Sequence, residues 1–322
     1  MGGESESRQS WDPLTTGIGQ SIVPCVEMDA LRPDLDESHS RAVARSRKST
    51  WRIASFVLRR TTLALAGIFC LGACKQPLLV GQYRCPGSGM DGGSPPSRFD
   101  PISVPWSAGF ENQFCDYPSS EEPGWCYGFS PASYRVVSSP VHTGQFAAEF
   151  TVLTGTDGGA QPQARCSRQG VFPAEAYYGA WYLVPEIRTL ATDTDNWNLF
   201  HFQGGNSDAT SIHYLWDVSL VNGSTGDLNL RVVVGQDPTK HPTSTKSVPI
   251  GKWFHIVFYW KRAKDTSGEV SLYQDGERVV DLTNLVTDDS DWDQWYVGNL
   301  ATALQPPQST VYVDDITIRA TP

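Results

Sequence analysis

The chain has 322 residues, with 25 Lys and Arg against 35 Asp and Glu and a formal net charge of −10 at pH 7. Nucleic acids and anionic membrane surfaces are bound through clustered Lys and Arg, so this acidic balance argues against both as partners. It does not exclude an acidic polysaccharide that is held in a local basic groove.

A short apolar run, residues 61–73, follows Arg59-Arg60 and ends at Cys74. A basic flank, a short apolar run and small residues before a cut site are the parts of a secretory signal, and the run is too short to span a bilayer. The last four residues, Leu71-Gly72-Ala73-Cys74, resemble the lipobox of bacterial lipoproteins, in which the chain is cut before a cysteine that is then acylated. The alternative is a buried apolar helix that ends in a cysteine.

This signal divides the chain into three parts. Residues 1–73 are expected to be an N-terminal extension plus signal peptide, disordered or removed. Residues 74–103 are rich in Gly, Pro and Ser and are expected to form a flexible linker. Residues 104–322 are expected to form one domain, held outside the cytoplasm by lipid on Cys74 at the outer membrane or cell surface of a bacterium.

Four cysteines besides Cys74 follow the signal: Cys85, Cys115, Cys126 and Cys166. An even number of cysteines in an oxidising compartment predicts disulfides, and four of them allow three pairings. A bond between Cys115 and Cys126 is favoured because it closes a short loop rich in Pro and Gly. No spacing of Cys or His indicates a zinc site.

From Val104 onward the chain consists of short β-branched and aromatic runs separated by turn residues such as Asn222-Gly223 and Asp275-Gly276. Helical periodicity is absent over any long stretch, and no internal repeat is visible. The expected strands are 134–138, 146–153, 163–169, 177–184, 197–203, 212–220, 228–234, 253–261, 270–274, 278–282, 295–298 and 310–319. We therefore expect an all-β, two-sheet antiparallel sandwich of the jelly-roll type.

Several expected strands are apolar on both faces, most clearly residues 253–260. One such face is needed for the core, whereas a second aromatic face indicates either a covered sheet or a ligand platform. Sugar rings stack on exposed Trp and Tyr because their C–H faces are apolar. The candidate platform residues are Tyr178, Trp181, Tyr182, Trp197 and Trp216; the alternative is that these side chains belong to the core.

Five segments in this order resemble the concanavalin A-like polysaccharide lyases of the heparin-lyase, glucuronan-lyase and alginate-lyase type: 177–185, 197–203, 251–257, 270–280 and 311–316. The resemblance covers residues 107–322 and implies the same jelly-roll fold. It also implies cleavage of a uronic-acid polymer by β-elimination, although non-catalytic carbohydrate-binding modules share this fold.

Such a lyase needs donors or cations on the substrate carboxylate, a base at C5 and an acid for the leaving oxygen at C4. The resemblance assigns the first role to an Arg on an early strand, here Arg165 or Arg168, which lie on opposite faces of it. The family's Gln/His pair is present in reversed order as His201 and Gln203, which share one strand face. Arg165 or Arg168 and Gln203 would then neutralise the carboxylate, and His201 would act as the base.

The sequence departs from the family at the late tyrosine, because Leu300 stands where the phenol is expected. Tyr214, Tyr178 or Tyr182 would have to supply the acid instead. His213, beside Tyr214, is a second candidate base.

Glu111, near the start of the domain, and Asp314 and Asp315, near its end, resemble the terminal strands of jelly-roll carbohydrate-binding modules. Those modules often hold a structural calcium, for which carboxylate oxygens are suitable ligands. The alternative is a solvated or hydrogen-bonded terminal strand. No other cofactor is required.

Two functions remain open from the sequence. One is a lyase acting on a uronate polymer, and the other is a non-catalytic binding or adhesion module that uses the same groove. A third option is an envelope protein with no sugar ligand. The expected partners are a polysaccharide and, through the lipid anchor, a membrane, with the chain acting as a monomer.

Overall fold

The computed structural model describes residues 97–117, 124–129, 131–155, 161–192, 195–208, 212–235 and 240–322. All of them belong to the unit Gly72–Pro322. The predicted signal, Cys74, Cys85 and most of the predicted linker lie outside the described residues. Within the described ranges no helix has the length and apolar character needed to cross a membrane.

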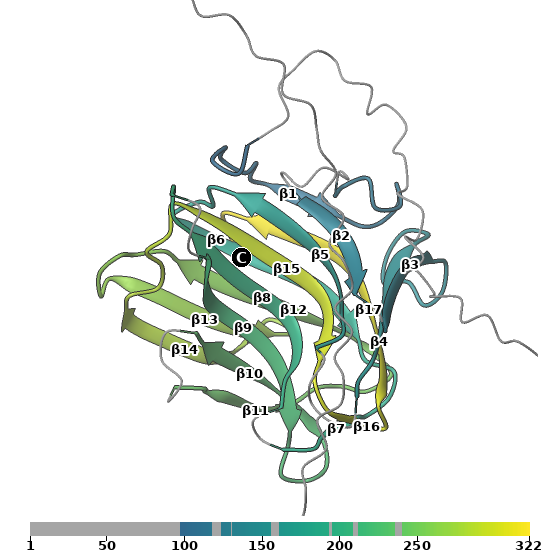
Figure 1. The fold of residues 1–322 in the computed structure, drawn as a ribbon. Helices are drawn as coiled ribbons and strands as arrows, with labels where there is room; N and C mark the ends of the chain where they lie inside the picture. Colours follow the sequence, from purple (N-terminus) through teal and green to yellow (C-terminus); the bar gives the residue numbers. More distant parts are fainter. Residues whose placement is uncertain are drawn as a thin grey trace, which may run out of the picture. The chain divides into compact units, whose positions relative to one another are not determined.

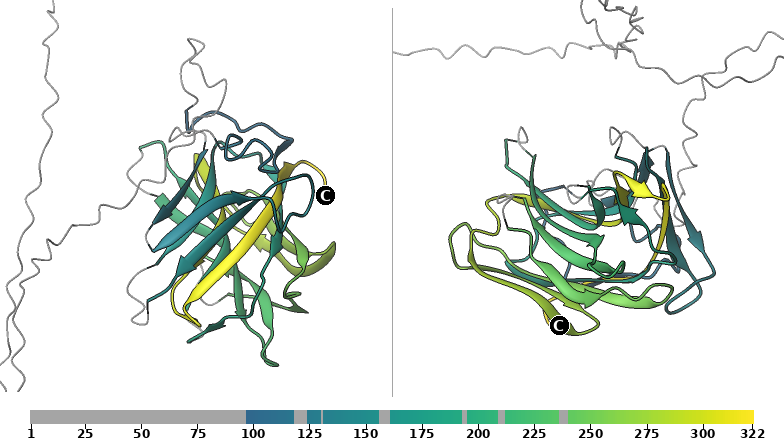
Figure 2. Two further views of the ribbon diagram at one scale, coloured as in Figure 1. Left: turned by 90° about the vertical axis from the view of Figure 1, so that its right-hand side faces the viewer. Right: turned by 90° about the horizontal axis from the view of Figure 1, so that it is seen from below.

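Two large antiparallel sheets face each other (Figures 1 and 2). The first has the order β14 (Glu277–Leu285), β13 (Gly268–Gln274), β12 (Trp253–Lys261), β6 (Glu175–Leu183), β17 (Gln308–Arg319), β4 (Ala147–Leu153) and β3 (Ala132–Val137), with β1 (Trp106–Ala108) also paired to β17. The second has the order β11 (Thr243–Ser247), β10 (Leu228–Val234), β9 (Ile212–Asn222), β8 (Trp197–Gly205), β15 (Trp292–Ala301), β5 (Gln163–Gly170) and β2 (Gly124–Phe129). A short pair is formed by β7 (Thr189–Leu190) and β16 (Leu304–Gln305). The predicted all-β, two-sheet sandwich is confirmed.

Every strand expected from the sequence is present, but β1, β2, β7, β11 and β16 were not anticipated. β1, β7 and β16 are too short to show a pattern, and β11 consists of Thr, Ser and Lys. The Asp275-Gly276 turn between β13 and β14 has φ values of 53° and 77°. Positive φ at both central residues is what a tight hairpin turn requires, and Asp-Gly supplies it at low cost.

Aromatic side chains fill the space between the sheets. Phe200 and Phe202 of β8 are fully buried, and Phe202 stacks on Phe258 of β12 at 4.8 Å between ring centroids. Trp295 of β15 stacks on the same Phe202 at 6.0 Å. Because successive side chains of a strand point to opposite faces, this packing turns His201 and Gln203 away from the core.

The described disulfide joins Cys126 of β2 to Cys166 of β5, with 4.0 Å between their Cα atoms. The two residues are direct partners in the ladder between these strands. Cys115 is also disulfide-bonded. The favoured Cys115–Cys126 pairing is therefore wrong, because β2 carries Cys126 alongside β5 rather than leaving it in the loop that holds Cys115.

A stacked aromatic column stands on the outer face of the first sheet. The ring of Trp181 lies 3.8 Å from that of His142 and 4.9 Å from that of His255, measured between centroids. Burial, reinforced by the nearby Arg319 guanidinium, lowers the pKa of His255 to about 4. The folded protein therefore holds this imidazole neutral under conditions in which an unfolded chain would protonate it.

We expect proteolysis without reduction to yield a peptide pair linked through Cys126 and Cys166. Replacing both cysteines by Ala is expected to lower the free energy of unfolding by about 4 kcal/mol in the loop-entropy relation, given a separation of 40 residues. Urea unfolding of the oxidised protein measures this loss. Recovery of a Cys115–Cys126 peptide would contradict the assignment.

The His255→Gln variant is expected to weaken the acid destabilisation of the fold. Since the pKa of His255 is lower in the folded state, its contribution to stability is complete above the unfolded value and is lost as pH falls from 6.5 toward 4. Between pH 7.5 and pH 5 the variant should therefore lose roughly 1 kcal/mol less unfolding free energy than the wild type. Above pH 7.5 the difference between the two proteins should no longer depend on pH, which provides the control; equal losses on acidification would contradict the assignment.

Candidate active site

A pocket of about 480 Å³ opens on the second sheet, on the face turned away from the first. It is lined by Tyr127, Gln161, Gln163, Arg165, Asn196, His201, Gln203, Tyr214, Asp217, Tyr296 and Leu300. These residues come from five adjacent strands, β2, β5, β15, β8 and β9, and from the loops that precede β5 and β8. We call this pocket the groove.

One cross-strand row runs through the middle of the groove. His201 of β8 lies directly opposite Asp217 of β9 on one side and Tyr296 of β15 on the other. Residues that face each other across a ladder project on the same face of the sheet. The register of three strands therefore brings an imidazole, a carboxylate and a phenol together.

Hydrogen bonds connect this row to Gln203. His201 Nδ1 lies 2.6 Å from Asp217 Oδ1, and His201 Nε2 lies 3.2 Å from Gln203 Oε1. The Gln203 amide donates to the Tyr296 hydroxyl at 2.9 Å, and that hydroxyl donates to Gln294 Oε1 at 2.5 Å. The predicted pair, His201 and Gln203, thus lies in the groove and shares a continuous polar network with Tyr296.

Arg165 is the cation of the groove. Arg165 is only 5% exposed, and its guanidinium lies 5.7 Å from the centroid of the Tyr296 ring. It also contacts the Tyr127 hydroxyl, whose pKa is raised by burial and lowered by this guanidinium. Among the described residues no Asp or Glu forms an ion pair with Arg165. A buried charge without a counter-ion is costly, so this guanidinium is suited to an incoming anion.

Arg168 points elsewhere, as the alternation of β5 requires. Its guanidinium lies 4.5 Å from the centroid of the Trp106 ring. Burial lowers the pKa of Arg168, and Tyr117 and Asp116 partly offset this. Arg168 does not line the groove, so of the two candidate arginines only Arg165 is in a position to meet a ligand there.

Tyr296 is the phenol that the sequence did not reveal. Burial raises its pKa well above the ordinary value, and nearby Tyr127 raises it further, while Arg165 lowers it. The phenol is therefore protonated at neutral pH and can act as a proton donor. Leu300 lines the same groove. Tyr296 lies four positions before Leu300 on the same strand, so the two side chains share one face. Strand alternation could therefore have identified Tyr296 from the sequence.

Tyr214 also lies in the groove, where its ring stacks on His201 at 5.3 Å with 20° between the planes. Burial and the neighbouring Asp217 raise the pKa of this phenol. Asp217 lines the groove too. Tyr214 and Asp217 are three positions apart, and on a regular strand two such residues would point to opposite faces. A shift in the β8–β9 register, from the Phe202–Trp216 pair to the Gln203–Tyr214 pair, accounts for this placement.

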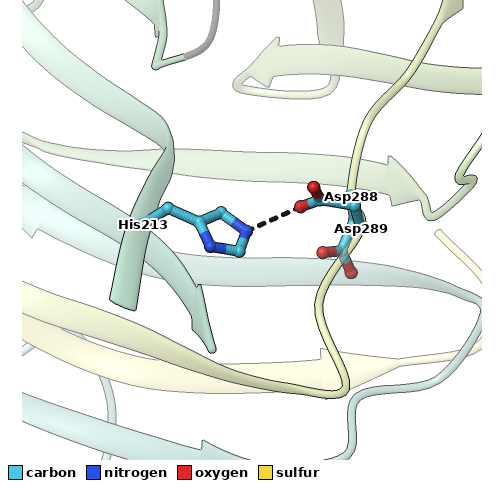
Figure 3. Close-up of side chains that lie close together, drawn as sticks. All are labelled: His213, Asp288 and Asp289. Carbon is cyan, nitrogen blue, oxygen red and sulfur yellow. Dashed lines mark ion pairs between the residues drawn. The ribbon is translucent and has the colours of Figure 1, made fainter. Parts of the chain in front are cut away.

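His213 lies outside the groove, so its predicted role as a base is wrong. Its Nε2 atom lies 2.7 Å from Asp289 Oδ1 and 3.0 Å from Ser290 Oγ. Figure 3 shows the imidazole pointing toward the segment that carries Asp288 and Asp289. As the neighbour of Tyr214 on the same strand, His213 projects to the other face.

Within the described ranges, His213, Asp288 and Asp289 are the only three His, Cys, Asp or Glu residues whose ligand atoms all lie within 4.8 Å of one another. Asp288 is already paired with the Arg262 guanidinium and accepts a hydrogen bond from the Ser290 amide at 2.8 Å. The cluster is accounted for by its own hydrogen bonds and ion pairs.

Most of the predicted sugar platform is core. Tyr178, Tyr182, Trp197 and Trp216 are buried between the sheets, and none of them lines the groove. Internal acceptors take up both indole N–H groups: Trp197 Nε1 donates to Asn299 Oδ1 at 3.1 Å and Trp216 Nε1 donates to the Thr287 carbonyl at 3.0 Å. Trp181 stands on the outer face of the first sheet, away from the groove. The prediction of a sugar platform is wrong for the four core side chains, because strands that are apolar on both faces do not reveal which face is inside. For Trp181 it stays a prediction.

The three carboxylates proposed for calcium do not converge as ligands, since they do not form a group within 4.8 Å. Asp314 accepts hydrogen bonds from the His142 and Thr143 amides at 3.0 and 3.3 Å. Glu111 accepts one from the Gln145 amide at 2.9 Å, and Asp315 lies 2.6 Å from His142 Nδ1. They anchor the loop before β4, and calcium there stays a prediction.

The family model for polysaccharide lyases matches residues 106–317. An endo-β-1,4-glucuronan lyase structure from the fungus Trichoderma reesei has 19% identity and a TM-score of 0.50, over 61% of this chain and 90% of that one. An alginate lyase in complex with an alginate trisaccharide has 13% identity and a TM-score of 0.44, over 68% and 98%. An alginate lyase from Pseudomonas aeruginosa has 11% identity and a TM-score of 0.42, over 54% and 83%.

No curated protein sequence matches this chain. The glucuronan lyase supports the fold, and the family model covers most of the sandwich domain, including every strand that contributes to the groove. The chain therefore belongs to the polysaccharide lyase family.

Proposed function

We propose that the groove binds a uronic-acid polymer and cleaves it by β-elimination. The observation that carries this proposal is Arg165, a buried guanidinium in the groove without an acidic partner among the described residues. It lies beside a base candidate, His201, and a phenol, Tyr296, which are the other groups that the reaction needs. Membership of the polysaccharide lyase family and the fold shared with a glucuronan lyase support the same assignment.

The first task of the site is to neutralise the substrate carboxylate. A proton on the carbon next to a carboxylate is removed with difficulty, because the resulting carbanion adds charge to a group that is already negative. Arg165 supplies a fixed positive charge and two parallel N–H donors for a carboxylate. Gln203 supplies an amide donor from the neighbouring part of the groove. Such preorganised donors are most effective where water is excluded.

The second task is to move two protons. His201 Nε2 accepts the C5 proton, the C5–H electron pair forms the C4–C5 double bond, and the C4–O bond breaks. The leaving oxygen takes the proton of the Tyr296 hydroxyl, which burial keeps protonated. Transfer of the proton from His201 back to the Tyr296 phenolate restores both groups, so atoms and charge balance without a further reactant. Gln203 lies between the two side chains in the resting network.

A non-catalytic binding module remains the second candidate, and Leu300 is the observation that favours it. An apolar side chain stands where the resembling lyases carry a tyrosine. In this case Arg165 and the polar groups of the groove would hold the polymer without cleaving it.

The lipid anchor at Cys74 stays a prediction from the sequence alone. We propose that it holds the domain outside the cytoplasm, where extracellular polysaccharides are available. The intact mass of the mature protein tests this, because a product without lipid that retains the first 73 residues would exclude it.

We expect the full chain to release unsaturated product, detected by ultraviolet absorbance, from one of glucuronan, alginate or heparin. Arg165→Gln should lower kcat/KM by about 10²–10³-fold, because the carboxylate loses its counter-charge. Arg278→Gln changes an exposed charge on the first sheet and serves as the matched control. No product from any of the three polymers, with binding retained, would favour the module.

Tyr296→Phe removes the proposed acid and changes the shape of the groove very little. We expect kcat to fall by about 10²–10⁴-fold while the affinity for the polymer is retained. Tyr177→Phe removes a hydroxyl from the outer face of the first sheet and should leave turnover unchanged. Full activity of Tyr296→Phe would show that another group protonates the leaving oxygen.

A further inference from the structure

Among the described residues that line the groove, Asp217 is the one carboxylate. An acidic side chain is unfavourable in a site for an anionic polymer, because like charges repel. Asp217 is only 4% exposed, and its Oδ1 lies 2.6 Å from His201 Nδ1. Binding of an anionic polymer does not explain why a buried carboxylate lies against the imidazole of His201.

The contact determines which nitrogen of His201 faces the substrate. A carboxylate can only accept hydrogen bonds, so the short contact requires a proton on Nδ1. In the neutral imidazole Nε2 is then the unprotonated nitrogen. Nε2 is the atom on the Gln203 side, within the groove, 3.2 Å from Gln203 Oε1. An unprotonated Nε2 needs a donor there, and a half-turn of the Gln203 amide supplies one: it directs the N–H₂ group at Nε2 and leaves the amide oxygen to accept from the Tyr296 hydroxyl. Asp217 therefore leaves His201 with its basic nitrogen directed toward the place where a C5 proton would lie.

The surrounding side chains restrict the ring further. Tyr214 stacks on His201 at 5.3 Å with 20° between the planes, and the Tyr296 ring lies 5.4 Å away at 48°. Direct pairing of His201 with Asp217 in the β8–β9 ladder fixes the distance between their backbones. The imidazole is thus restrained by aromatic rings and by one hydrogen-bonding partner at Nδ1.

We propose that Asp217 is the positioning residue of the lyase reaction. It holds His201 in the Nδ1–H tautomer and balances the positive charge that His201 acquires when it removes the C5 proton. This inference rests on the proposed function of the groove. A carboxylate has the same role toward the catalytic His of hydrolytic triads. Replacing that Asp by Asn preserves the geometry but favours the wrong tautomer of the His.

The test compares Asp217→Asn with the wild type. Asn has nearly the same shape but carries no charge and can present its N–H₂ group to His201, which would favour the other tautomer. We expect kcat to fall at least about hundredfold, with KM changed less than about threefold, because the lost interaction acts on turnover. Asp265→Asn removes an exposed charge on the turn between β12 and β13 and serves as the control, with both constants unchanged.

A spectroscopic measurement separates positioning from a purely structural role. In protein with ¹⁵N-labelled histidine, the His201 resonances, identified by their loss in His201→Gln, report which ring nitrogen carries the proton. We expect the Nδ1–H form in the wild type and its loss in a folded Asp217→Asn variant, with thermal unfolding as the check on folding. An Nε2–H form in the wild type would overturn the inference.

The kinetic outcomes distinguish the two proposals. An inactive wild type on all three polymers overturns the proposed function, and the tautomer measurement still tests the role of Asp217 toward His201. An active wild type with an equally active Asp217→Asn overturns the positioning role and leaves the proposed function intact.

Discussion

The aromatic layer between the two sheets is the constraint on which the groove depends. Phe200 and Phe202 pack against rings from β12 and β15, and a shift of β8 by one residue would move both onto the outer face. The cost of exposing two Phe side chains is several kcal/mol, which fixes the strand in register. The same register holds His201 and Gln203 on the outer face beside Tyr296. Packing on the inner face of the sheet therefore determines which side chains project into the groove on the outer face.

The electrostatics of the groove are local and differ from those of the whole chain. The net charge is −10, yet the groove contains Arg165 without an acidic partner in the described structure. Asp217, the single carboxylate among the described lining residues, is engaged by His201. In a partly buried site a single charge is weakly screened, so its effect on an incoming carboxylate exceeds that of the distant surface charges. Overall charge thus says little about a ligand that is held in a narrow groove.

The groove also shows that a phenol can reach it from a different position on the same strand. Leu300 stands where the resembling lyases place a phenol, and Tyr296, on the same strand and in the same groove, provides one. Gln203 links this phenol to His201 through hydrogen bonds of 2.9 and 3.2 Å. A tyrosine hydroxyl can reach one point from more than one position on a strand, because the phenol is long. The proposed reaction therefore needs a phenol near His201 rather than a tyrosine at a fixed place in a motif.

The sequence by itself determined the sandwich class, nearly all the long strands and the shared face of His201 and Gln203, because strand periodicity and turn chemistry are local properties. Only the tertiary structure decided which face of a doubly apolar strand is inside, and so placed Tyr178, Tyr182, Trp197 and Trp216 in the core. The register shift between β8 and β9 put both Tyr214 and Asp217 in the groove, which simple alternation does not allow. The Cys126–Cys166 bond likewise depends on β2 pairing with β5. Cross-strand register arises from contacts between residues far apart in the chain, so no local pattern contains it.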